Sequence, residues 1–285
     1  MKNFKKKNIL FVVCHPDDEV LWCGGLIYHL SKIPYFNINV ICLSGRDINS
    51  PRELEFNNAM KLANVHNSLI LGGPLRKLLE PLPFIPDTTQ SGLSKLGINI
   101  SEIDLLITHS PYGDEHLSPH HRQANKELYY WCSKYNISFA YFSLIPLPYF
   151  KHKSVLYSLK REKSFFLLNS FKVHINFLKK IFFLIFDGGY MLPKYYSQFL
   201  VDHKIKSALL ECYTSINLEM HRNGYAMFDS NCESLYFIDS KGYEIIHNEI
   251  NKLDTPGAKD LFKEYSDYRV LLSKIYRKYF YNLFK

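Results

Sequence analysis

The stretch Ile9-Leu-Phe-Val-Val-Cys14-His15-Pro-Asp-Asp-Glu19 decides the fold of this chain. Its first six residues are continuously apolar, which is typical of a strand buried on both faces of a parallel sheet. Pro16 ends that strand, because proline cannot donate to the hydrogen-bond ladder of a central strand. Asp17 to Ser31 then predicts a helix with acidic residues in its first turn, where the helix dipole favours them.

Strands and helices continue to alternate through the first half of the chain. We expect strands at 39–44, 68–71, 103–108 and 138–144 and helices at 51–65 and 119–135. This alternation predicts an α/β fold with a Rossmann-like, doubly wound, mostly parallel sheet. The proline-containing residues 72–102 predict a long loop at the functional rim. The C-terminal portion is less regular, with a helix expected at 201–213 and an amphipathic stretch at 258–284.

The chain length fits one large domain with an appended segment. Its 285 residues contain 47% hydrophobic residues, enough for a sizeable core. We divide the chain into a domain at 1–240 and a C-terminal helical extension at 241–285, packed on that domain. The six cysteines include no C-x-x-C pair, which favours a reduced, cytoplasmic protein over a disulfide scaffold.

The formal net charge of +8 gathers in local clusters. These clusters indicate either a solvated surface or attraction to an acidic substrate or an anionic membrane face. No nucleic-acid recognition motif is found, so no nucleic-acid partner is expected. Residues 165–186 mix Phe and Leu with Lys, which predicts a helix or lid packed on the domain. The alternative is an interfacial element that gives peripheral contact with a membrane.

Two clusters of metal-type side chains follow strands that we expect to be neighbours. His15, Asp17 and Asp18 come after the first strand, and the His-rich segment 116–121 comes after the strand at 103–108. In a doubly wound sheet, ligands bind beyond the carboxyl ends of the strands, where the strand order reverses. If the first and fourth strands are adjacent, both clusters open onto one crevice.

The residue types in these clusters suit a catalytic divalent ion. Imidazole and carboxylate ligands suit zinc, and iron as the alternative, and a catalytic site keeps one position for water. His15 and Asp18 can point at one ion across the strand-to-helix turn, whereas Asp17 would point toward the water. Asp17 is therefore the candidate general base. An Asp-Asp pair at a helix start usually only complements the dipole, but the second histidine cluster favours a metal site.

The same residues resemble the signature of the PIG-L/LmbE-like deacetylases. His15-Pro-Asp-Asp-Glu19 followed by Gly24-Gly25 is similar to the first motif of that family, although Gly24-Gly25 alone indicates only close helix packing. Ser118-Pro-His-His-Arg122 resembles the second motif, usually written His-Pro-x-His. Weaker resemblances are carried by Arg52-Glu53 with Ala59 and Ala63, by Lys206 to Ser215 with its closing Tyr-x-Ser, and by Glu233. Together they cover roughly residues 8–240.

The resemblance implies a zinc-dependent hydrolase. Such an enzyme removes an acyl group, commonly acetyl, from an amine on a sugar or glycoconjugate. The family pattern implies His15 and Asp18 as metal ligands, Asp17 as the base and Arg52 as a substrate contact. A nucleotide-binding Rossmann protein is disfavoured, because two carboxylates at the first strand-to-helix turn would repel a pyrophosphate.

The third ligand and the oxyanion donor depend on the second motif. Its last histidine falls on His121, which implies this residue as the third ligand, with His120 the alternative if the alignment shifts by one residue. The first histidine, which helps to stabilise the oxyanion in the family, is Ser118 here, and a hydroxyl is the poorer donor. We expect His116 or His120 to take over that role, or the metal to carry it alone. Ser118 also supports a competing hypothesis, a non-catalytic metal- or sugar-binding homologue of the same fold.

Overall fold

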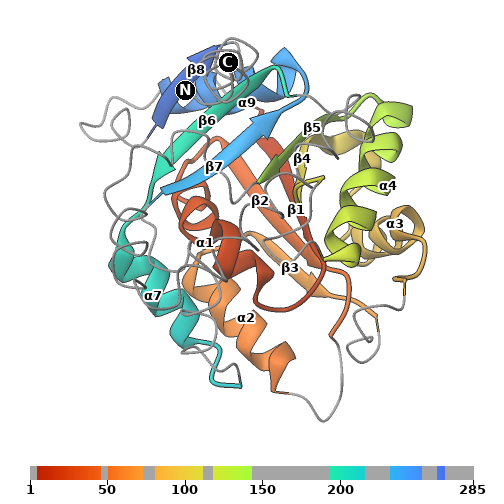
Figure 1. Cartoon of the computed structure of the whole chain (residues 1–285), viewed down its shortest axis with the longest axis vertical. Helices are drawn as coiled ribbons and strands as arrows, with labels where there is room; N and C mark the ends of the chain where they lie inside the picture. Colours follow the sequence, from red (N-terminus) through yellow and green to blue (C-terminus); the bar gives the residue numbers. More distant parts are fainter. Residues whose placement is uncertain are drawn as a thin grey trace, which may run out of the picture.

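A computed structural model of the chain describes residues 5–45, 51–72, 81–111, 118–142, 193–215, 232–251 and 262–266. Within these ranges a sheet runs through the middle of the molecule, and helices lie on both of its faces (Figure 1). The arrangement confirms the α/β class predicted from the alternating strands and helices.

The described part of the chain forms an eight-stranded sheet in the order β3-β2-β1-β4-β5-β7-β6-β8. Its strands are β1 (Lys7–Val13), β2 (Phe36–Cys42), β3 (Asn67–Ile70), β4 (Ile103–Thr108), β5 (Ser138–Phe142), β6 (Tyr195–Leu200), β7 (Cys232–Phe237) and β8 (Phe262–Ser266). The strands from β1 to β5 are parallel, whereas β7, β6 and β8 join antiparallel at one side. The doubly wound, mostly parallel sheet is therefore confirmed.

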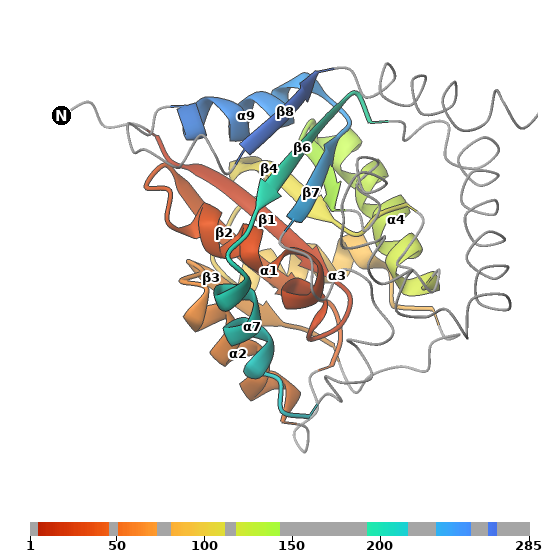
Figure 2. The same ribbon diagram turned by 60° about the vertical axis from the view of Figure 1, so that its left-hand side comes forward.

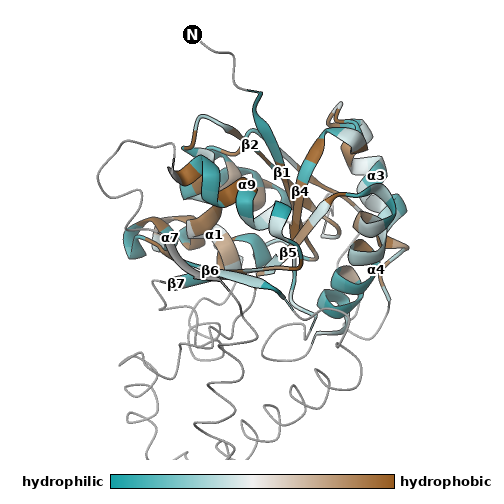
Figure 3. Ribbon diagram, turned by 90° about the horizontal axis from the view of Figure 1, so that it is seen from above, coloured by the Kyte–Doolittle hydropathy of each residue, from teal (hydrophilic) through white to brown (hydrophobic). Residues whose placement is uncertain are grey.

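The apolar run after the N-terminus lies at the centre of the sheet. Every residue from Ile9 to Cys14 is 0% exposed. Alternate residues beginning with Ile9 pack beneath α1 (Asp18–Ser31), α2 (Arg52–Leu62), α7 (His203–Glu211) and α9 (Ser240–Asn251). The others, beginning with Leu10, pack beneath α3 (Ile85–Lys95) and α4 (Pro119–Tyr135). Figure 3 shows brown, hydrophobic stretches of β1 and β4 between these two helix layers, while the start of β1 is teal.

The prediction of a long loop at 72–102 is wrong for Ile85–Lys95, which form α3. This helix begins with Pro86 in its first turn, where a missing amide hydrogen costs nothing. Its buried residues recur at helical spacing: Ile85, Thr89, Gly92 and Leu93. A Cβ atom at Gly92 would lie 2.9 Å from side chains of both Ile41 and Leu71, so the glycine lets α3 approach the sheet. Tertiary packing thus stabilises a helix that the local composition conceals.

The segment 241–285 is predicted to be a helical extension, but at Phe262–Ser266 the structure has a strand instead. Helix α9 lies on the sheet, but Phe262–Ser266 forms β8 and pairs antiparallel with β6 (Figure 2). The outer edge of β6 offers unpaired backbone groups, and strand pairing satisfies them. Residues 267–285 lie outside the described ranges, and the division at residue 240 stays a prediction.

The segment 165–186, predicted to be a packed helix or lid with membrane contact as the alternative, also lies outside the described residues. Among the helices that are described, none has the length and apolar character needed to cross a bilayer.

The fold places the two histidine-bearing segments side by side. Strands β1 and β4 are neighbours, with Phe11 opposite Ile107. The chain passes from β1 into α1 and from β4 toward α4, so the start of each helix lies at the same edge of the sheet. The predicted adjacency of the first and fourth strands is therefore confirmed, and the strand order reverses between them.

Candidate metal centre

Three side chains meet beyond the carboxyl ends of β1 and β4. His15 follows β1, Asp18 begins α1, and His121 lies in the first turn of α4. Asp18 Oδ2 lies 3.2 Å from His15 Nδ1 and 3.2 Å from His121 Nε2. The two imidazole nitrogens are 3.3 Å apart. Asp18 and His121 are buried, and His15 is half-buried.

This donor set fits a divalent cation. Ligand atoms about 2.1 Å from a tetrahedral zinc ion lie about 3.4 Å from one another, close to the three separations found here. Burial acts to raise the pKa of Asp18, but the neighbouring imidazoles, with His121 the strongest, outweigh it and hold that pKa well below its usual range. Asp18 is therefore ionised, as a metal ligand must be. Two imidazoles and one carboxylate are typical of catalytic zinc sites.

The turn between β1 and α1 is held by its own hydrogen bonds. The backbone amide of His15 donates to Asp18 Oδ2 at 2.8 Å. The indole of Trp22 donates to Asp18 Oδ1 at 3.3 Å. Both oxygens of the carboxylate are thus oriented by groups from the same strand-to-helix connection, which limits the motion of Asp18.

Asp17 adopts a left-handed backbone conformation with φ 114° and ψ −29°. Such a conformation costs about 1–3 kcal/mol for a residue with a side chain, so surrounding contacts must hold it. Arg52 Nη1 donates to Asp17 Oδ2 at 2.8 Å and to the carbonyl of Pro16 at 2.9 Å. The amide of Asp17 donates to Glu19 Oε2 at 3.1 Å. Arg52 therefore lies against the predicted base, while its contact with substrate stays a prediction.

Burial and the charge of Asp18 raise the pKa of Asp17 to about 6, although Arg52 and His15 oppose the shift. A carboxyl group with a pKa near the working pH can both accept and return a proton. The site thus provides a second carboxylate whose electrostatic environment differs from that of the neighbouring Asp18.

Glu19 lies behind Asp17 and is fully buried. Burial raises the pKa of Glu19 to about 8. The hydroxyl of Tyr213 donates to Glu19 Oε1, while Glu19 Oε2 accepts the amide of Asp17. Glu19 thereby connects Tyr213, which follows α7, to the strained turn at Asp17.

The second motif places its two consecutive histidines differently. His121 reaches Asp18, whereas His120 Nδ1 lies 2.9 Å from His15 Nε2, on the side of that ring away from Asp18. The geometry therefore brings His121, rather than His120, together with the other two predicted ligands. Ser118 is the buried N-cap residue of α4, and His116 lies outside the described residues.

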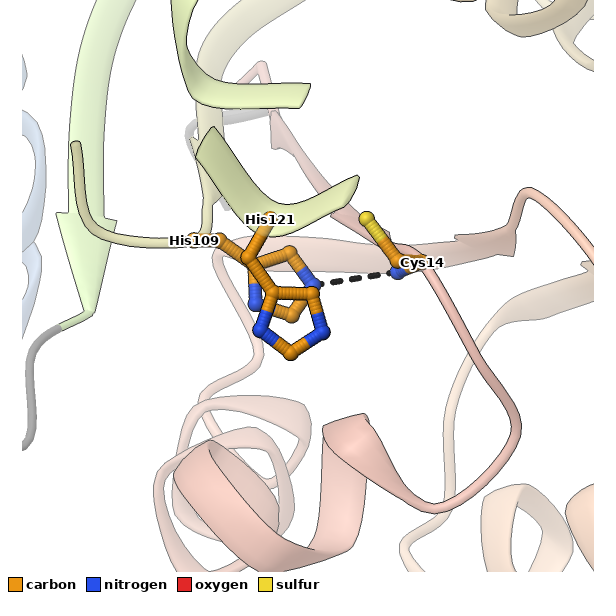
Figure 4. Close-up of side chains that lie close together, drawn as sticks. All are labelled: Cys14, His109 and His121. Atoms are coloured by element: carbon orange, nitrogen blue, oxygen red, sulfur yellow. Dashed lines mark hydrogen bonds between the residues drawn. The ribbon is translucent and has the colours of Figure 1, made fainter. Parts of the chain in front are cut away.

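His109 is a member of the cluster that the sequence reasoning missed. It is 1% exposed, and its ring stacks on His121 with centroids 3.8 Å apart (Figure 4). His109 Nε2 accepts the amide of Cys14 at 3.0 Å and lies 3.4 Å from Asp18 Oδ2. The pKa of His109 lies well below its usual range, mainly because the ring is buried and secondly because of the charge of His121. The ring is therefore neutral. The one sequence feature that could have indicated His109 as a site residue is its position directly after the strand at 103–108.

Cys14, His109 and His121 form a second group with ligand-type atoms within 4.8 Å of one another. Figure 4 shows the two stacked rings and the hydrogen bond from the Cys14 amide to His109. Because His109 Nε2 already accepts that amide, this group suits structural support. The cluster that includes His15 and Asp18 is the better cation site.

No family model matches the sequence, and no curated protein matches it. Solved structures do match. A deacetylase triple mutant involved in the teicoplanin biosynthetic pathway is 12% identical over 81% of this chain and 97% of its own, with a TM-score of 0.50. The chain has the PIG-L/LmbE-like deacetylase fold. At this level of identity the likeness establishes the fold alone. The chemistry of the site must therefore be argued from the residues of this chain.

Two further solved structures are similar to this chain. A deacetylase–bog complex in the teicoplanin pathway is 14% identical over 81% of this chain and 97% of its own, with a TM-score of 0.48. The N,N'-diacetylchitobiose deacetylase from Pyrococcus horikoshii is 21% identical over 45% of this chain and 49% of its own, with a TM-score of 0.35.

The later segments that resemble the deacetylase family brace α1. This helix is kinked at Cys23, where φ is −147° and ψ is 20°. The amides of Gly25 and Leu26 donate to Glu233 Oε1 and Oε2 at 3.2 and 2.6 Å. Lys206 Nζ lies 3.1 Å from Glu233 Oε1. The buried carboxylate thus caps the helical segment that begins after the kink.

The paired glycines of α1 pack closely, as predicted. A Cβ atom at Gly25 would lie 2.4 Å from Val201 Cβ, and one at Gly24 would lie 3.3 Å from Leu209 Cδ1. In the same region Glu55 accepts the amide of Ser215 at 2.7 Å. These contacts join α1 and α2 to the segment around α7 and support the turn that carries the metal-type side chains.

Proposed function

We propose that the chain is a metal-dependent hydrolase that removes an N-acetyl group from an amino sugar or glycoconjugate. The observation that supports this most directly is the triangle of His15 Nδ1, Asp18 Oδ2 and His121 Nε2, with Asp17 beside it. A divalent ion bound by these atoms, Zn²⁺ or alternatively Fe²⁺, would polarise the amide carbonyl and lower the pKa of water.

Asp17 is the proposed proton carrier. Arg52 holds its Oδ2 atom at 2.8 Å, so we assign the proton transfer to Oδ1. In the hydrolysis, a bond forms between a water oxygen and the acyl carbon, and the bond between that carbon and the amide nitrogen breaks. Asp17 takes a proton from the water and returns it to the departing amine nitrogen. The products are a free amine and a carboxylic acid, which ionises and gives its remaining proton to the amine or to solvent.

The substrate class rests on two kinds of support. The motifs around His15 and Ser118 resemble those of a family that acts on N-acetylated sugars. The structure with a TM-score of 0.50 is named as a deacetylase of the teicoplanin pathway. The half-buried environment of Asp17 would limit the access of bulk water and strengthen the interactions of charged groups with the reacting amide.

Ser118 favours a second candidate, a non-catalytic metal- or sugar-binding protein with the same fold. A hydroxyl stands where an imidazole would help to stabilise an oxyanion. His120 Nδ1 contacts His15, so the His120 ring is held behind a predicted ligand. The two candidates differ in turnover, which makes them separable by experiment.

The test is release of acetate and free amine from N-acetylglucosamine derivatives by the full chain. Activity should vanish with a chelator and return with added Zn²⁺ or Fe²⁺. Asp17→Asn should keep its metal content and lose nearly all turnover, because the proton acceptor is gone. Asp87→Asn changes an exposed aspartate in the first turn of α3 and should leave the rate unchanged.

Full activity of Asp17→Asn would remove this residue from the mechanism. A wild-type chain that binds one ion and releases neither acetate nor amine would favour the non-catalytic candidate. A chain whose deacetylation is insensitive to chelation would overturn the metal dependence.

A further inference from the structure

The two ring nitrogens of His15 face different partners. Nδ1 lies 3.2 Å from Asp18 Oδ2 and 3.3 Å from His121 Nε2. Nε2 lies 2.9 Å from His120 Nδ1, and the two rings are tilted by 46°. We infer that His120 is a positioning residue that fixes the tautomer and orientation of His15 for metal binding, an inference that rests on the proposed function.

The tautomers follow from the directions of these contacts. A neutral imidazole carries one proton, and a ligating nitrogen must present its lone pair to the cation. If His15 binds through Nδ1, its proton lies on Nε2 and is donated to His120 Nδ1. The separation of 2.9 Å is normal for such a hydrogen bond. His120 then carries its own proton on Nε2.

Ligating histidines commonly donate their second ring N–H to a carboxylate, a backbone carbonyl or water, which orients the ring and raises its basicity. Here a neutral imidazole takes that place. It accepts the same hydrogen bond without adding a negative charge to a region that already contains Asp17 and Asp18. The arrangement therefore supports His15 while leaving the net charge of the ligand set unchanged.

The beginning of α4 holds both histidines of the second motif in place. Pro119 starts the helix, and consecutive helical residues point about 100° apart. His121 is directed to Asp18, and His120 to the far nitrogen of His15. His120 is 1% exposed, so packing restricts its rotamer. One turn of helix thus supplies both a predicted ligand and the support for another.

The experiment measures the Zn²⁺ dissociation constant of the full chain by competition with a chelating dye. His120→Ala should weaken binding by about 10- to 100-fold, the range typical of lost outer partners. His120→Asn and His120→Asp should restore most of the affinity, because their Oδ1 atom lies about where His Nδ1 lies and can accept from His15. His66→Ala changes an exposed histidine and should leave the constant unchanged.

A second readout is the visible absorption spectrum of the Co²⁺-substituted protein. It should change shape in His120→Ala and return toward that of the wild type in His120→Asn. Affinity of His120→Ala within twofold of wild type, with binding abolished in His121→Ala, would overturn the inference and leave the proposed site standing. Equal weakening in the Ala, Asn and Asp variants would assign His120 a packing role and also overturn the inference. Unchanged binding in His121→Ala would instead overturn the proposed site.

Discussion

Lys206 Nζ lies 3.1 Å from Glu233 Oε1, and both side chains are only 1% exposed. Removing one member of a buried ion pair leaves the other charge in a poor solvent. We therefore expect Lys206→Met to lower the free energy of unfolding by about 3–5 kcal/mol, as measured by urea denaturation. The loss should reach α1 as well, because Glu233 also accepts the amides of Gly25 and Leu26.

Lys204→Met is the matched control for this prediction, because Lys204 is exposed on the same helix. It should change the free energy of unfolding by less than about 0.5 kcal/mol. Combining Lys206→Met with Glu233→Gln should cost less than the sum of the two single changes, since the two residues share one interaction. Additive losses would show that the two side chains act independently.

The neighbouring glycines of α1 should respond differently to alanine. A methyl group at Gly25 would lie 2.4 Å from Val201 Cβ, a contact that requires the backbone to move. We expect Gly25→Ala to destabilise the protein by about 1–3 kcal/mol, the usual range for overpacking. At Gly24 the nearest atom is the flexible Leu209 Cδ1 at 3.3 Å, so Gly24→Ala should be close to neutral. Thermal unfolding compares the two, and equal effects would contradict the packing argument.

The first motif and the beginning of α4 could be placed from the sequence alone. The apolar run from Ile9 to Cys14 indicates a central strand by itself, and Pro16 marks its end. Once β1 and β4 are taken as neighbours, strand topology brings His15 and His121 together without any knowledge of side chains. These inferences depend on local pattern and connectivity, which the sequence carries directly.

Helix α3 could not be found in this way. Its Ile85 amide donates to Glu127 of α4 at 2.9 Å, and the Leu82 amide donates to Gln123 at 3.0 Å. These partners are about 40 residues away in the sequence, so the local composition, rich in proline and threonine, hides the helix. Helical stability here comes from tertiary contacts rather than from propensity.

The places of His109 and His120 in the cluster could not be predicted from the sequence for a related reason. His109 reads as one polar residue of a loop, and its place in the cluster depends on stacking against His121 from another element. His120 was expected to donate to an oxyanion or to replace His121 as a ligand. Its contact with His15 Nε2 depends on ring orientation, which no spacing rule supplies.

The hydroxyl of Tyr213 should contribute to stability through Glu19. Tyr213→Phe removes the donor to a fully buried carboxyl group while keeping the ring, so an acceptor is left without that partner. We expect a loss of about 1–3 kcal/mol in the free energy of unfolding. Tyr130→Phe, at a ring that is 54% exposed, should change it little. Turnover of Tyr213→Phe should fall with unchanged Zn²⁺ affinity, since Glu19 also holds the amide of Asp17.

Glu55 makes a pH-dependent contribution to stability. Its carboxylate accepts from the Ser215 amide at 2.7 Å, the Thr214 hydroxyl at 2.9 Å and the Ser215 hydroxyl. Burial acts to raise the pKa of Glu55, but these hydrogen bonds and the charge of Arg52 outweigh it and lower the pKa from 4.5. A folded-state pKa below the unfolded value gives stability that is present above the unfolded pKa and lost as the pH falls through the folded pKa.

Glu55→Gln should therefore be less stable than the wild type at pH 7, and the difference should shrink as the pH falls below about 4.5. Urea unfolding of both proteins between pH 7 and pH 3 measures this difference. The wild type and Glu55→Gln contain the same histidines and carboxylates at the metal centre. The titration of those groups therefore largely cancels when the two free energies of unfolding are compared. Glu244→Gln, at an exposed position of α9, should follow the wild type at each pH. If the stability difference between Glu55→Gln and the wild type stayed the same at every pH, the contacts would depend on the shape of the side chain and not on the carboxylate charge.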